Sequence, residues 1–457
     1  MKNKIFSLVL ALLLMLSITA CQNQNNAING GEIEKTVPEN REPQTDKLTI
    51  YMNPFCDDLI DRATVEFKRL YPDIELDIID FGTDLSGARS AYLQTLQTEL
   101  MSGKGPDLIV SAYFDFPDIR KAIEAGVFYD LDNFLLNDED FNFDLYNKAV
   151  LETGVFNGNR YIMPINYQTP IILTTQENLR AESIDINSFK TFTGFYESIK
   201  KYADRHKENN SVFWGQYPEA LYMVFPWFGI DFYNFDNKTI NLQSDELKIV
   251  LDSCKSMYNQ RAELNISGYS GDSVIALRNK KCLMELLTSH GIGNFLYDYG
   301  ALLHDQNPIF FNKPTSDGRT IAQISGFTAI NNSSNNKQNA YNFIKILLSP
   351  SIQNANDMFS GGADIPVLKS AVEIRVNDTY KNLSGGTPDG SIVIEKIPQE
   401  IIDEYIQAIT EIDYCVLESW TPIGFLYEAM IPYCEDRSSY ESCIAEAKNK
   451  LELYMYE

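Results

Sequence analysis

Two tryptophan residues have the side-chain chemistry best suited to holding a flat ligand. Trp227 lies in an irregular aromatic segment beside Phe228, and Trp420 lies at the start of a predicted C-terminal helix. Flat aromatic faces cover the apolar faces of sugar rings, and Asp, Asn, Glu and Arg side chains hydrogen-bond paired hydroxyls. We therefore expect both residues to line a ring-stacking site; the alternative is that each belongs to the core. The third tryptophan, Trp214, fits the core better.

Signatures of enzymes are missing from the sequence. There is no Gly-x-Ser-x-Gly elbow, no His-Glu-x-x-His, no Walker A loop and no Gly-x-Gly-x-x-Gly after a strand. Carboxylate pairs such as Asp57-Asp58 occur, but a chain with 63 Asp and Glu residues produces them by chance. These observations favour a binding protein. The alternative is a secreted carbohydrate-active enzyme.

The cysteine and histidine residues leave little material for a metal site. The chain has three His and seven Cys, and no Cys-x-x-Cys pair. We expect no metal and no cofactor. Cys434 and Cys443 are close enough in sequence to bridge, but most of the cysteines fit better as small buried apolar residues.

The sequence is strongly acidic and rich in aromatic residues. Its 457 residues include 63 Asp and Glu against 38 Lys and Arg, for a formal net charge of −25, and 12% are aromatic. A nucleic-acid binder needs a basic face, so the charge argues against that class and against docking on anionic lipid. The length suggests two or three domains. The aromatic excess reflects either an AT-rich genome or a ring-stacking site.

The N-terminal segment has the pattern of a secretory leader. Two lysines precede Ile5–Ile18, an apolar stretch too short to span a bilayer as a helix. A small residue directly before Cys21 resembles a bacterial lipobox, which implies that Cys21 is lipidated; the alternative is an ordinary signal peptide with a coincidental Cys. We expect a signal peptide at 1–20, a polar disordered tether at 21–46, and anchoring to the outer face of the cell membrane.

The first part of the predicted folded body alternates strand and helix patterns. Strands are expected at Leu48–Met52, Ile74–Phe81 and Leu108–Val110, and helices at Asp57–Leu70, 87–102 and 119–127. Such alternation implies right-handed crossovers and a parallel sheet with helices on both faces.

The order of these strands predicts where a ligand binds. In such sheets ligands bind beyond the carboxyl ends of the strands, where the strand order reverses. If the order is 2-1-3, the reversal lies between the first and third strands. Asn53, Ser111 and Tyr113 follow these two strands, so we expect them to bind ligand.

The rest of the chain is richer in helix patterns. The expected elements are a strand at Tyr161–Leu173 with two prolines, helices at 187–205, 244–262 and 273–285, a strand at Ile321–Ile330, a helix at Lys337–Leu348, and several helices within 397–455.

Six segments behind the lipobox resemble, in order and spacing, family 1 of the bacterial extracellular solute-binding proteins, the maltose-binding-protein type. They are Ser102–Val110, Gly126–Leu131, Gly158–Pro164, Pro170–Leu173, Gly326–Leu348, and Gly361–Val367 with Ser370. Two segments depart from the family pattern. Asn187–Phe192 lacks the expected Trp, and His290 stands near a position where the family has an aromatic residue.

The resemblance implies a two-lobed α/β fold, each lobe a mostly parallel sheet flanked by helices, with an added C-terminal helical segment. Lobe one would comprise 47–164 and 327–362, and lobe two 165–326 and 363–457. Strands crossing between the lobes, near 164–167 and 324–327, would form the hinge.

Further ligand-binding residues follow from the implied lobe arrangement. Asn166, Tyr167 and Gly326 would lie at the crossings, Asp364 at the edge of lobe two, and His290 and Trp420 would face the ligand.

The favoured function is that of a lipid-anchored binding protein of an ABC importer. It would be a monomer that captures a small solute by hinge closure and delivers it to permease subunits in the membrane. An oligosaccharide or other sugar is the favoured solute. Nucleic acid is not an expected partner, and membrane contact would be through the lipid anchor alone. The alternatives are the carbohydrate-active enzyme and a ligand-binding lipoprotein that serves a membrane sensor.

Overall fold

The computed structural model describes most of the chain beyond the tether. The described residues are 46–52, 57–80, 88–112, 116, 118–207, 210–214, 229–230, 232–235, 237–258, 260, 272–287, 291–354, 364–383, 393–417 and 420–456. They belong to one compact unit, Pro43–Glu457. Among these residues, no helix combines the length and the hydropathy that a membrane crossing requires.

A seven-stranded sheet contains the first three predicted strands and both predicted crossings. Its strands are β1 (Lys47–Met52), β2 (Glu75–Asp80), β3 (Leu108–Ala112), β6 (Met163–Gln168), β13 (Ile321–Ile330), β14 (Ile365–Pro366) and β15 (Tyr414–Val416). The order is β14-β6-β13-β3-β1-β2, with β15 paired to β13. β1 is parallel to both β2 and β3, which confirms the 2-1-3 order from which the ligand position is predicted.

Helices cover this sheet and pack their apolar side chains against its buried strands. They are α2 (Asp57–Leu70), α3 (Ala88–Met101), α4 (Ile119–Glu124), α5 (Asp132–Leu135), α6 (Lys148–Glu152), α12 (Lys337–Leu348) and α13 (Pro350–Gln353). Phe67 of α2 packs on Phe343 of α12 with ring centroids 5.4 Å apart. Tyr51 of β1 meets Tyr92 of α3 at 6.4 Å. A short hairpin, β4 (Val155–Phe156) and β5 (Asn159–Arg160), precedes β6.

A second, four-stranded sheet has the order β12-β7-β11-β8. Its strands are β7 (Ile171–Thr175), β8 (Ser211–Phe213), β11 (Cys282–Leu287) and β12 (Pro308–Asn312), and a two-stranded ribbon pairs β9 (Tyr233–Asn234) with β10 (Thr239–Ile240). β8 and β11 are parallel, whereas β7 is antiparallel to both β11 and β12. In the first sheet, β13 is also antiparallel to β3 and β6. The sheets are therefore mixed rather than mostly parallel, because the chain returns along β13 after visiting the second sheet.

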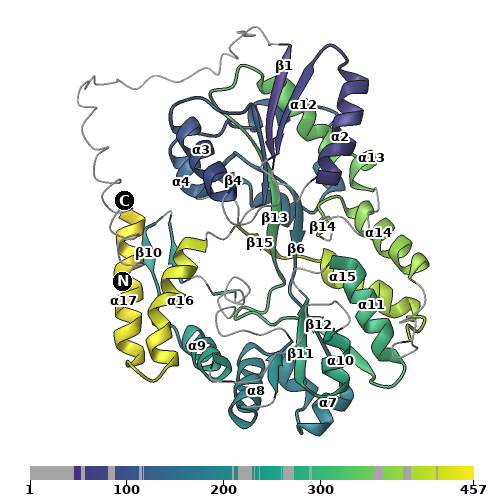
Figure 1. Cartoon of the computed structure of the whole chain (residues 1–457), viewed down its shortest axis with the longest axis vertical. Coiled ribbons are helices and arrows are strands. Elements are labelled where there is room, and N and C mark those ends of the chain that lie inside the picture. Colours follow the sequence, from purple (N-terminus) through teal and green to yellow (C-terminus); the bar gives the residue numbers. More distant parts are fainter. Residues whose placement is uncertain are drawn as a thin grey trace. The chain divides into compact units, whose positions relative to one another are not determined.

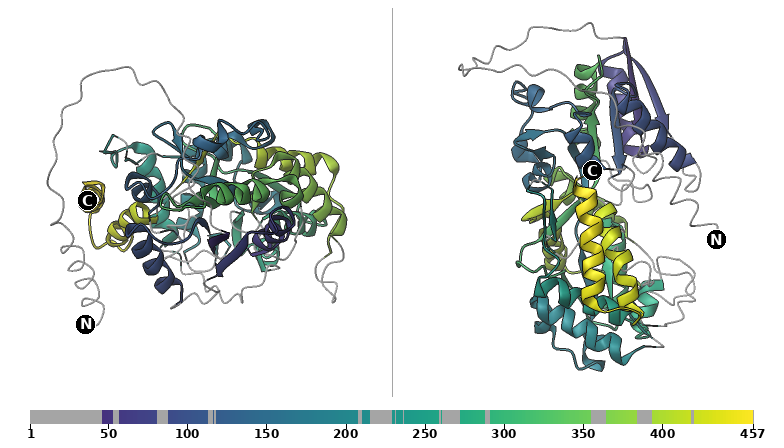
Figure 2. Two further views of the ribbon diagram at one scale, coloured as in Figure 1. Left: turned by 90° about the horizontal axis from the view of Figure 1, so that it is seen from above. Right: turned by 90° about the vertical axis from the view of Figure 1, so that its left-hand side faces the viewer.

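The remaining helices pack around the second sheet and the crossings (Figure 1). They are α7 (Gln176–Ala181), α8 (Phe192–Arg205), α9 (Asp245–Tyr258), α10 (Asp272–Arg278), α11 (Gly291–Leu303), α14 (Lys369–Asn382), α15 (Gln399–Thr410), α16 (Trp420–Cys434) and α17 (Tyr440–Tyr456), with 3-10 turns at Phe143–Leu145 and Ile186–Lys190. α16 and α17 lie side by side as a C-terminal hairpin (Figure 2).

Two predicted elements are wrong, for different physical reasons. The single strand at 161–173 is two strands, β6 and β7, because Pro170 has no N–H for a ladder and the chain changes sheets there. The helix predicted to reach residue 285 ends at Arg278. Lys280 takes a left-handed backbone conformation (φ 56°), and the apolar run after it forms β11. Periodicity alone does not separate a short buried strand from a buried helix segment.

The cysteines of the described residues are unbridged. Cys254, Cys282, Cys434 and Cys443 are buried free thiols, and Cys415 is partly buried. This agrees with the prediction that most cysteines act as small apolar residues.

Candidate ligand-binding site

One face of the paired strands β6 and β13 carries four polar side chains. Gln323 lies opposite Gln168 in the antiparallel ladder, and Ile324 lies opposite Tyr167. Directly opposed residues point to the same face and successive residues to opposite faces. Asn166, Gln168 and Gln323 therefore share one face. The register shifts at Ser325, and its hydrogen bond to Asn166 places it on the same face. With Asp364, just before β14, we call these residues the polar crossing face. In Figure 1 these strands lie in the middle of the fold, between the helices of the two sheets.

Hydrogen bonds join the polar crossing face across three chain segments. The Gln168 side-chain amide donates to the Asp364 carboxylate at 2.7 Å. The Ser325 hydroxyl donates to the Asn166 side-chain oxygen at 2.9 Å. These bonds hold β6, β13 and the start of β14 in fixed register, and the side chains of Asn166, Gln323 and Ser325 are buried.

Gln323 differs from the other residues of this face, because its side-chain amide makes no hydrogen bond within the described residues. The residue is 1% exposed, and within the described part of the chain neither its side-chain oxygen nor its nitrogen has a hydrogen-bond partner. A buried amide without partners is destabilising, at about 1–3 kcal/mol. A planar group that offers one acceptor and two donors is suited to a ligand that presents both kinds of group.

Asp364 has a carboxyl group whose acidity is altered by its surroundings. Burial raises its pKa from 3.8 to about 6, although hydrogen bonds from Gln168 and Ser325 and the charge of Arg375 act in the opposite direction. The side chain keeps some solvent exposure. At neutral pH the carboxylate is mostly ionised and accepts the Gln168 bond.

Tyr167 lies on the opposite face from Asn166, although the two residues are adjacent in sequence. It is fully buried, and its hydroxyl donates to the Ile409 carbonyl at 2.7 Å. The Asn147 amide approaches the same hydroxyl at 3.5 Å. Its ring therefore supports the crossing from behind, and this position favours a core role.

Gly326 and Ser111 also have local structural explanations. A Cβ on Gly326 would lie 2.5 Å from the Asn166 side-chain oxygen, so only glycine permits the close approach of β13 to β6. Ser111 is fully buried in β3, and its hydroxyl donates to the adjacent Ala112 carbonyl at 3.0 Å. A ligand contact for either residue stays a prediction.

The second sheet offers one further candidate, Trp214. It follows β8 and is partly buried, and its indole N–H has no hydrogen-bond partner among the described residues. Buried indole N–H groups normally have one. β8 and β11 are parallel, so Trp214 lies at their shared carboxyl end, where ligands of such sheets bind.

Several predicted ligand-binding positions lie outside the described residues. They are Asn53, Tyr113, Trp227 and His290, and Cys21 with the whole tether. Trp420 is the first residue of α16, but its side chain also lies outside the described part.

Three residues of the polar crossing face are not among the predicted ligand-binding residues: Gln168, Gln323 and Ser325. A signal for two of them exists in β13, where Gln323 and Ser325 alternate with Ala322, Ile324 and Gly326 in an otherwise apolar strand. Polar residues at every second position of a buried strand indicate that one face of the strand makes polar contacts.

Comparison with known proteins shows which family this protein belongs to. The sequence matches the family of bacterial extracellular solute-binding proteins over residues 85–385, so the chain belongs to this family. The family is one of binding proteins that act outside the cytoplasm. The two-lobed fold expected from the sequence is confirmed by the solved structures that follow.

Three solved structures illustrate the fold. The sugar-binding protein MalE from Xanthomonas citri is 13% identical with a TM-score of 0.62, covering 90% of this chain and 97% of its own. An ABC substrate-binding protein from Listeria monocytogenes, in complex with cycloalternan, is 15% identical with a TM-score of 0.55, covering 90% and 99%. A binding protein from B. animalis subsp. lactis, in complex with beta-1,6-galactobiose, is 17% identical with a TM-score of 0.54, covering 90% and 98%. No curated protein matches the sequence.

Proposed function

We propose that this solute-binding protein captures a neutral, polyhydroxylated solute, an oligosaccharide or other sugar, over the polar crossing face. The observation that carries the proposal is the buried and unused amide of Gln323. Vicinal hydroxyls present a donor and an acceptor side by side, which matches a planar amide. The described hydrogen bonds of the face involve amides, a hydroxyl and one carboxyl group, and none involves a Lys or Arg side chain. This chemistry suits an uncharged ligand.

The solved structures that share the fold support a sugar as ligand. Those from Listeria and B. animalis hold cycloalternan and a galactobiose, and a Thermotoga protein of the same fold holds tagatose. Trp214, Trp227 and Trp420 are the candidates for stacking on the apolar faces of the sugar rings, a second requirement of carbohydrate sites.

Binding would proceed by closure of the two lobes around the strand crossings. Lobe one would comprise 47–164 and 327–362, and lobe two 165–326 and 363–457. β6 and β13 connect them, so a rotation of a few backbone bonds near 164–167 and 324–327 would move the lobes as rigid bodies. Four of the five residues of the polar crossing face belong to the connecting strands themselves, and the fifth, Asp364, precedes β14.

The cellular setting follows from the leader and the family. We infer that Cys21 carries a lipid anchor on the outer face of the cell membrane, that 22–46 is a tether, and that the monomer delivers its solute to the permease subunits of an ABC importer. The anchor is testable by metabolic labelling with a palmitate analogue. Label should be lost in Cys21→Ala.

A thermal-shift screen tests the ligand class. Residues 43–457 would be melted with maltose, maltotriose, galactobiose, amino acids and polyols. A ligand at about 100 times its dissociation constant stabilises by about 2.7 kcal/mol. We expect a shift with at least one saccharide, reduced in Gln323→Ala and kept in Gln338→Ala, an exposed glutamine of α12.

Two outcomes would contradict the proposal. A shift with another solute class and with no saccharide would overturn the sugar assignment. A full shift in Gln323→Ala would remove the polar crossing face from the site. Turnover of a glycan during the screen would support the enzyme alternative instead.

A further inference from the structure

The last turn of the C-terminal helix contacts the helix that follows β3. The Tyr454 hydroxyl, near the end of α17, donates a hydrogen bond to the Asp118 carboxylate. Asp118 is the N-cap of α4, where it also accepts from the backbone N–H of Lys121 at 3.0 Å. The Lys121 ammonium lies 4.1 Å from the centre of the Tyr454 ring. One tyrosine is therefore held by a carboxylate at its hydroxyl and by a cation at its face.

A second contact lies beside the first and uses the preceding residue of α4. The Arg120 guanidinium is 5.3 Å from the centre of the Phe156 ring and 5.7 Å from that of Phe235. Phe156 belongs to β4, next to the first sheet, whereas Phe235 follows β9 and packs edge-on against Tyr454. Arg120 thus links an aromatic residue from each side of the contact.

The aromatic side of this contact is a small apolar core of its own. Phe235, Tyr454 and Met455 are buried together, separately from the two large core clusters, and Phe425 of α16 packs on them. Burial of three large side chains makes this a defined surface rather than a frayed helix end.

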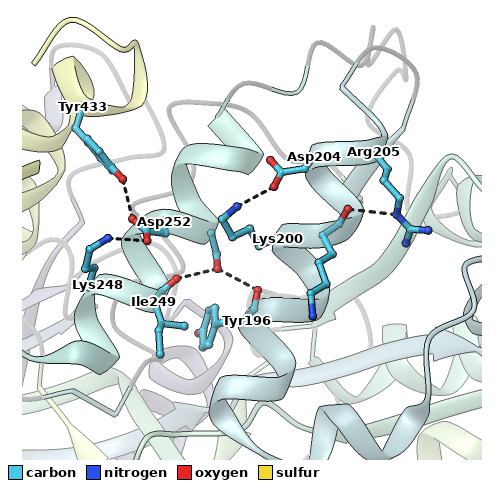
Figure 3. Close-up of polar contacts among 10 residues, drawn as sticks. Tyr196, Lys200, Asp204, Arg205, Lys248, Ile249, Asp252 and Tyr433 are labelled. Atoms are coloured by element: carbon cyan, nitrogen blue, oxygen red, sulfur yellow. Dashed lines mark hydrogen bonds and ion pairs between the residues drawn. The ribbon is translucent and has the colours of Figure 1, made fainter. Parts of the chain in front are cut away.

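The other end of the hairpin is fixed to α9, which packs in the core of the second sheet. The Tyr433 hydroxyl of α16 donates to Asp252 at 2.7 Å, and Asp252 is also paired with Lys248 (Figure 3). In the turn between α16 and α17, Asp436 pairs with Lys255 at 2.5 Å, and Glu435 accepts from the Tyr258 hydroxyl at 3.1 Å. α9 is bonded in turn to α8, because the Ser253 hydroxyl donates to the Tyr196 carbonyl at 3.0 Å.

We propose that the C-terminal hairpin α16–α17 is a latch between the lobes. The turn of the hairpin is bonded to α9, and Tyr454 of α17 contacts Asp118 and Lys121 of α4. α4 follows β3 of the first sheet, and α9 packs in the core of the second, so relative rotation of the lobes must strain or break the Tyr454–Asp118–Lys121 contact. The latch stabilises the arrangement seen here against others in the ensemble. Tyr454, Asp118 and Lys121 lie on elements other than the crossing strands, so this contact can tune closure independently of the polar crossing face.

Interlobe distance measurements test the latch without any ligand. Spin labels at Val65→Cys in α2 and Lys201→Cys in α8, both exposed, would report one lobe each, in a background with Cys21, Cys56 and Cys415 replaced by Ser. We expect a narrower distance distribution in the parent than in Tyr454→Phe, and the broadest and most shifted distribution in Tyr454→Phe with Lys121→Met. Phenylalanine keeps the ring in the small apolar core, so folding is retained, which circular dichroism would verify.

Tyr456→Phe is the matched control. Its ring is 70% exposed and contacts Lys238 instead of α4. Its distribution should equal that of the parent. The proposal fails if the double variant also equals the parent, or if Tyr456→Phe broadens the distribution as much. Because no ligand is present, these outcomes are independent of the sugar assignment.

Discussion

Gln168 and Asp364 are 196 residues apart in the chain and are joined by a 2.7 Å hydrogen bond. Gln168 is the last residue of β6, before the chain leaves for the second sheet. Asp364 comes just before β14, where the chain rejoins β6 after β13 and α12. The bond therefore joins the end of the first crossing strand to the segment that enters β14. Asp364 also supplies the carboxyl group of the polar crossing face. A change in the charge of Asp364 therefore also changes the hydrogen bond that positions it.

Asp364→Asn should stabilise the protein at neutral pH. The folded-state pKa of about 6 exceeds the unfolded value of 3.8, so the folded protein binds more protons between these values and loses stability as pH rises through that window. Asparagine keeps an acceptor for Gln168 and has no charge to desolvate. We expect the variant to gain about 1–2 kcal/mol in unfolding free energy at pH 7 and nothing at pH values below about 3.5. Urea unfolding at both pH values measures this. A gain that is equal at both would contradict the account.

Gly326→Ala should distort the crossing and weaken the Ser325–Asn166 bond. The added methyl would lie 2.5 Å from the Asn166 oxygen and 3.1 Å from an Ile165 side-chain carbon. We expect a loss of about 1–3 kcal/mol, typical of overpacking. Gly424→Ala in α16 is the control, because its Cβ would meet nothing within 4 Å. Alanine there should be neutral or stabilising by up to about 1 kcal/mol. Equal thermal unfolding midpoints for the two variants would contradict this explanation.

Much of the fold can be predicted because its elements carry local signals. The predicted bounds Asp57–Leu70, Ile321–Ile330 and Lys337–Leu348 are those observed for α2, β13 and α12. Helical stripes and continuous buried strands can be recognised in short windows of sequence, and the parallel pairing of the first strands follows from general rules of chain connection. The 2-1-3 order is a condition of the ligand-position prediction, and the structure confirms it. β11 is not predicted as a strand, because it forms by pairing with β7 and β8, which lie far away in sequence.

The site is harder to predict because it depends on which face a strand residue takes. The sequence places Asn166 and Tyr167 together at a crossing, but the pleat sends Asn166 to the polar crossing face and Tyr167 to the core beside Ile409. The only local signal for Gln323 is its alternation with apolar residues along β13. That signal does not show that its amide is buried and unpaired among the described residues, which the structure does.

Glu285→Gln should change how stability depends on pH. Glu285 of β11 and Asp298 of α11 are 3% and 2% exposed and hydrogen-bond each other, with Ser273 of α10 donating to Asp298 at 3.4 Å. Burial raises the pKa of both groups, that of Glu285 from 4.5 to about 7, so one proton is retained near neutrality. The wild type therefore loses stability as pH rises from 4.5 to 7. The substituted glutamine amide can donate to an ionised Asp298 without titrating.

Urea unfolding at a series of pH values measures the pH dependence of stability in Glu285→Gln and in the wild type. We expect the unfolding free energy of the variant relative to wild type to increase by about 1–3 kcal/mol between about pH 4.5 and about pH 7.5. Among the described residues, Cys282 interacts with Glu285 and Tyr297 with Asp298, and both are unchanged in the variant. Glu197→Gln, on the exposed face of α8, should give a difference that is small at every pH. A constant difference for Glu285→Gln would show that the pair does not share a proton.

Asp107→Ala should destabilise the first sheet without altering the ligand site. Asp107 ends the Gly-Pro-Asp segment before β3, and its carboxylate accepts from the Thr49 backbone N–H at 2.8 Å, the Ser334 hydroxyl at 2.6 Å and the Asn336 amide at 3.2 Å. One side chain thus joins β1, β3 and the turn that leads into α12. Loss of a charged acceptor with three partners should lower the unfolding free energy by about 2–4 kcal/mol.

Conservative and exposed variants separate this role from a general effect of charge. Asp107→Asn keeps one acceptor oxygen and should fall between wild type and alanine in urea unfolding. Asp73→Ala, at an exposed turn before β2, should stay within about 0.5 kcal/mol of wild type. Folded Asp107→Ala should keep the saccharide-induced thermal shift of the parent, because Asp107 contacts no residue of the polar crossing face in the hydrogen bonds described. Loss of that shift, with stability unchanged, would instead make Asp107 part of the ligand site, and the fixed register of β1, β3 and α12 would then need another explanation.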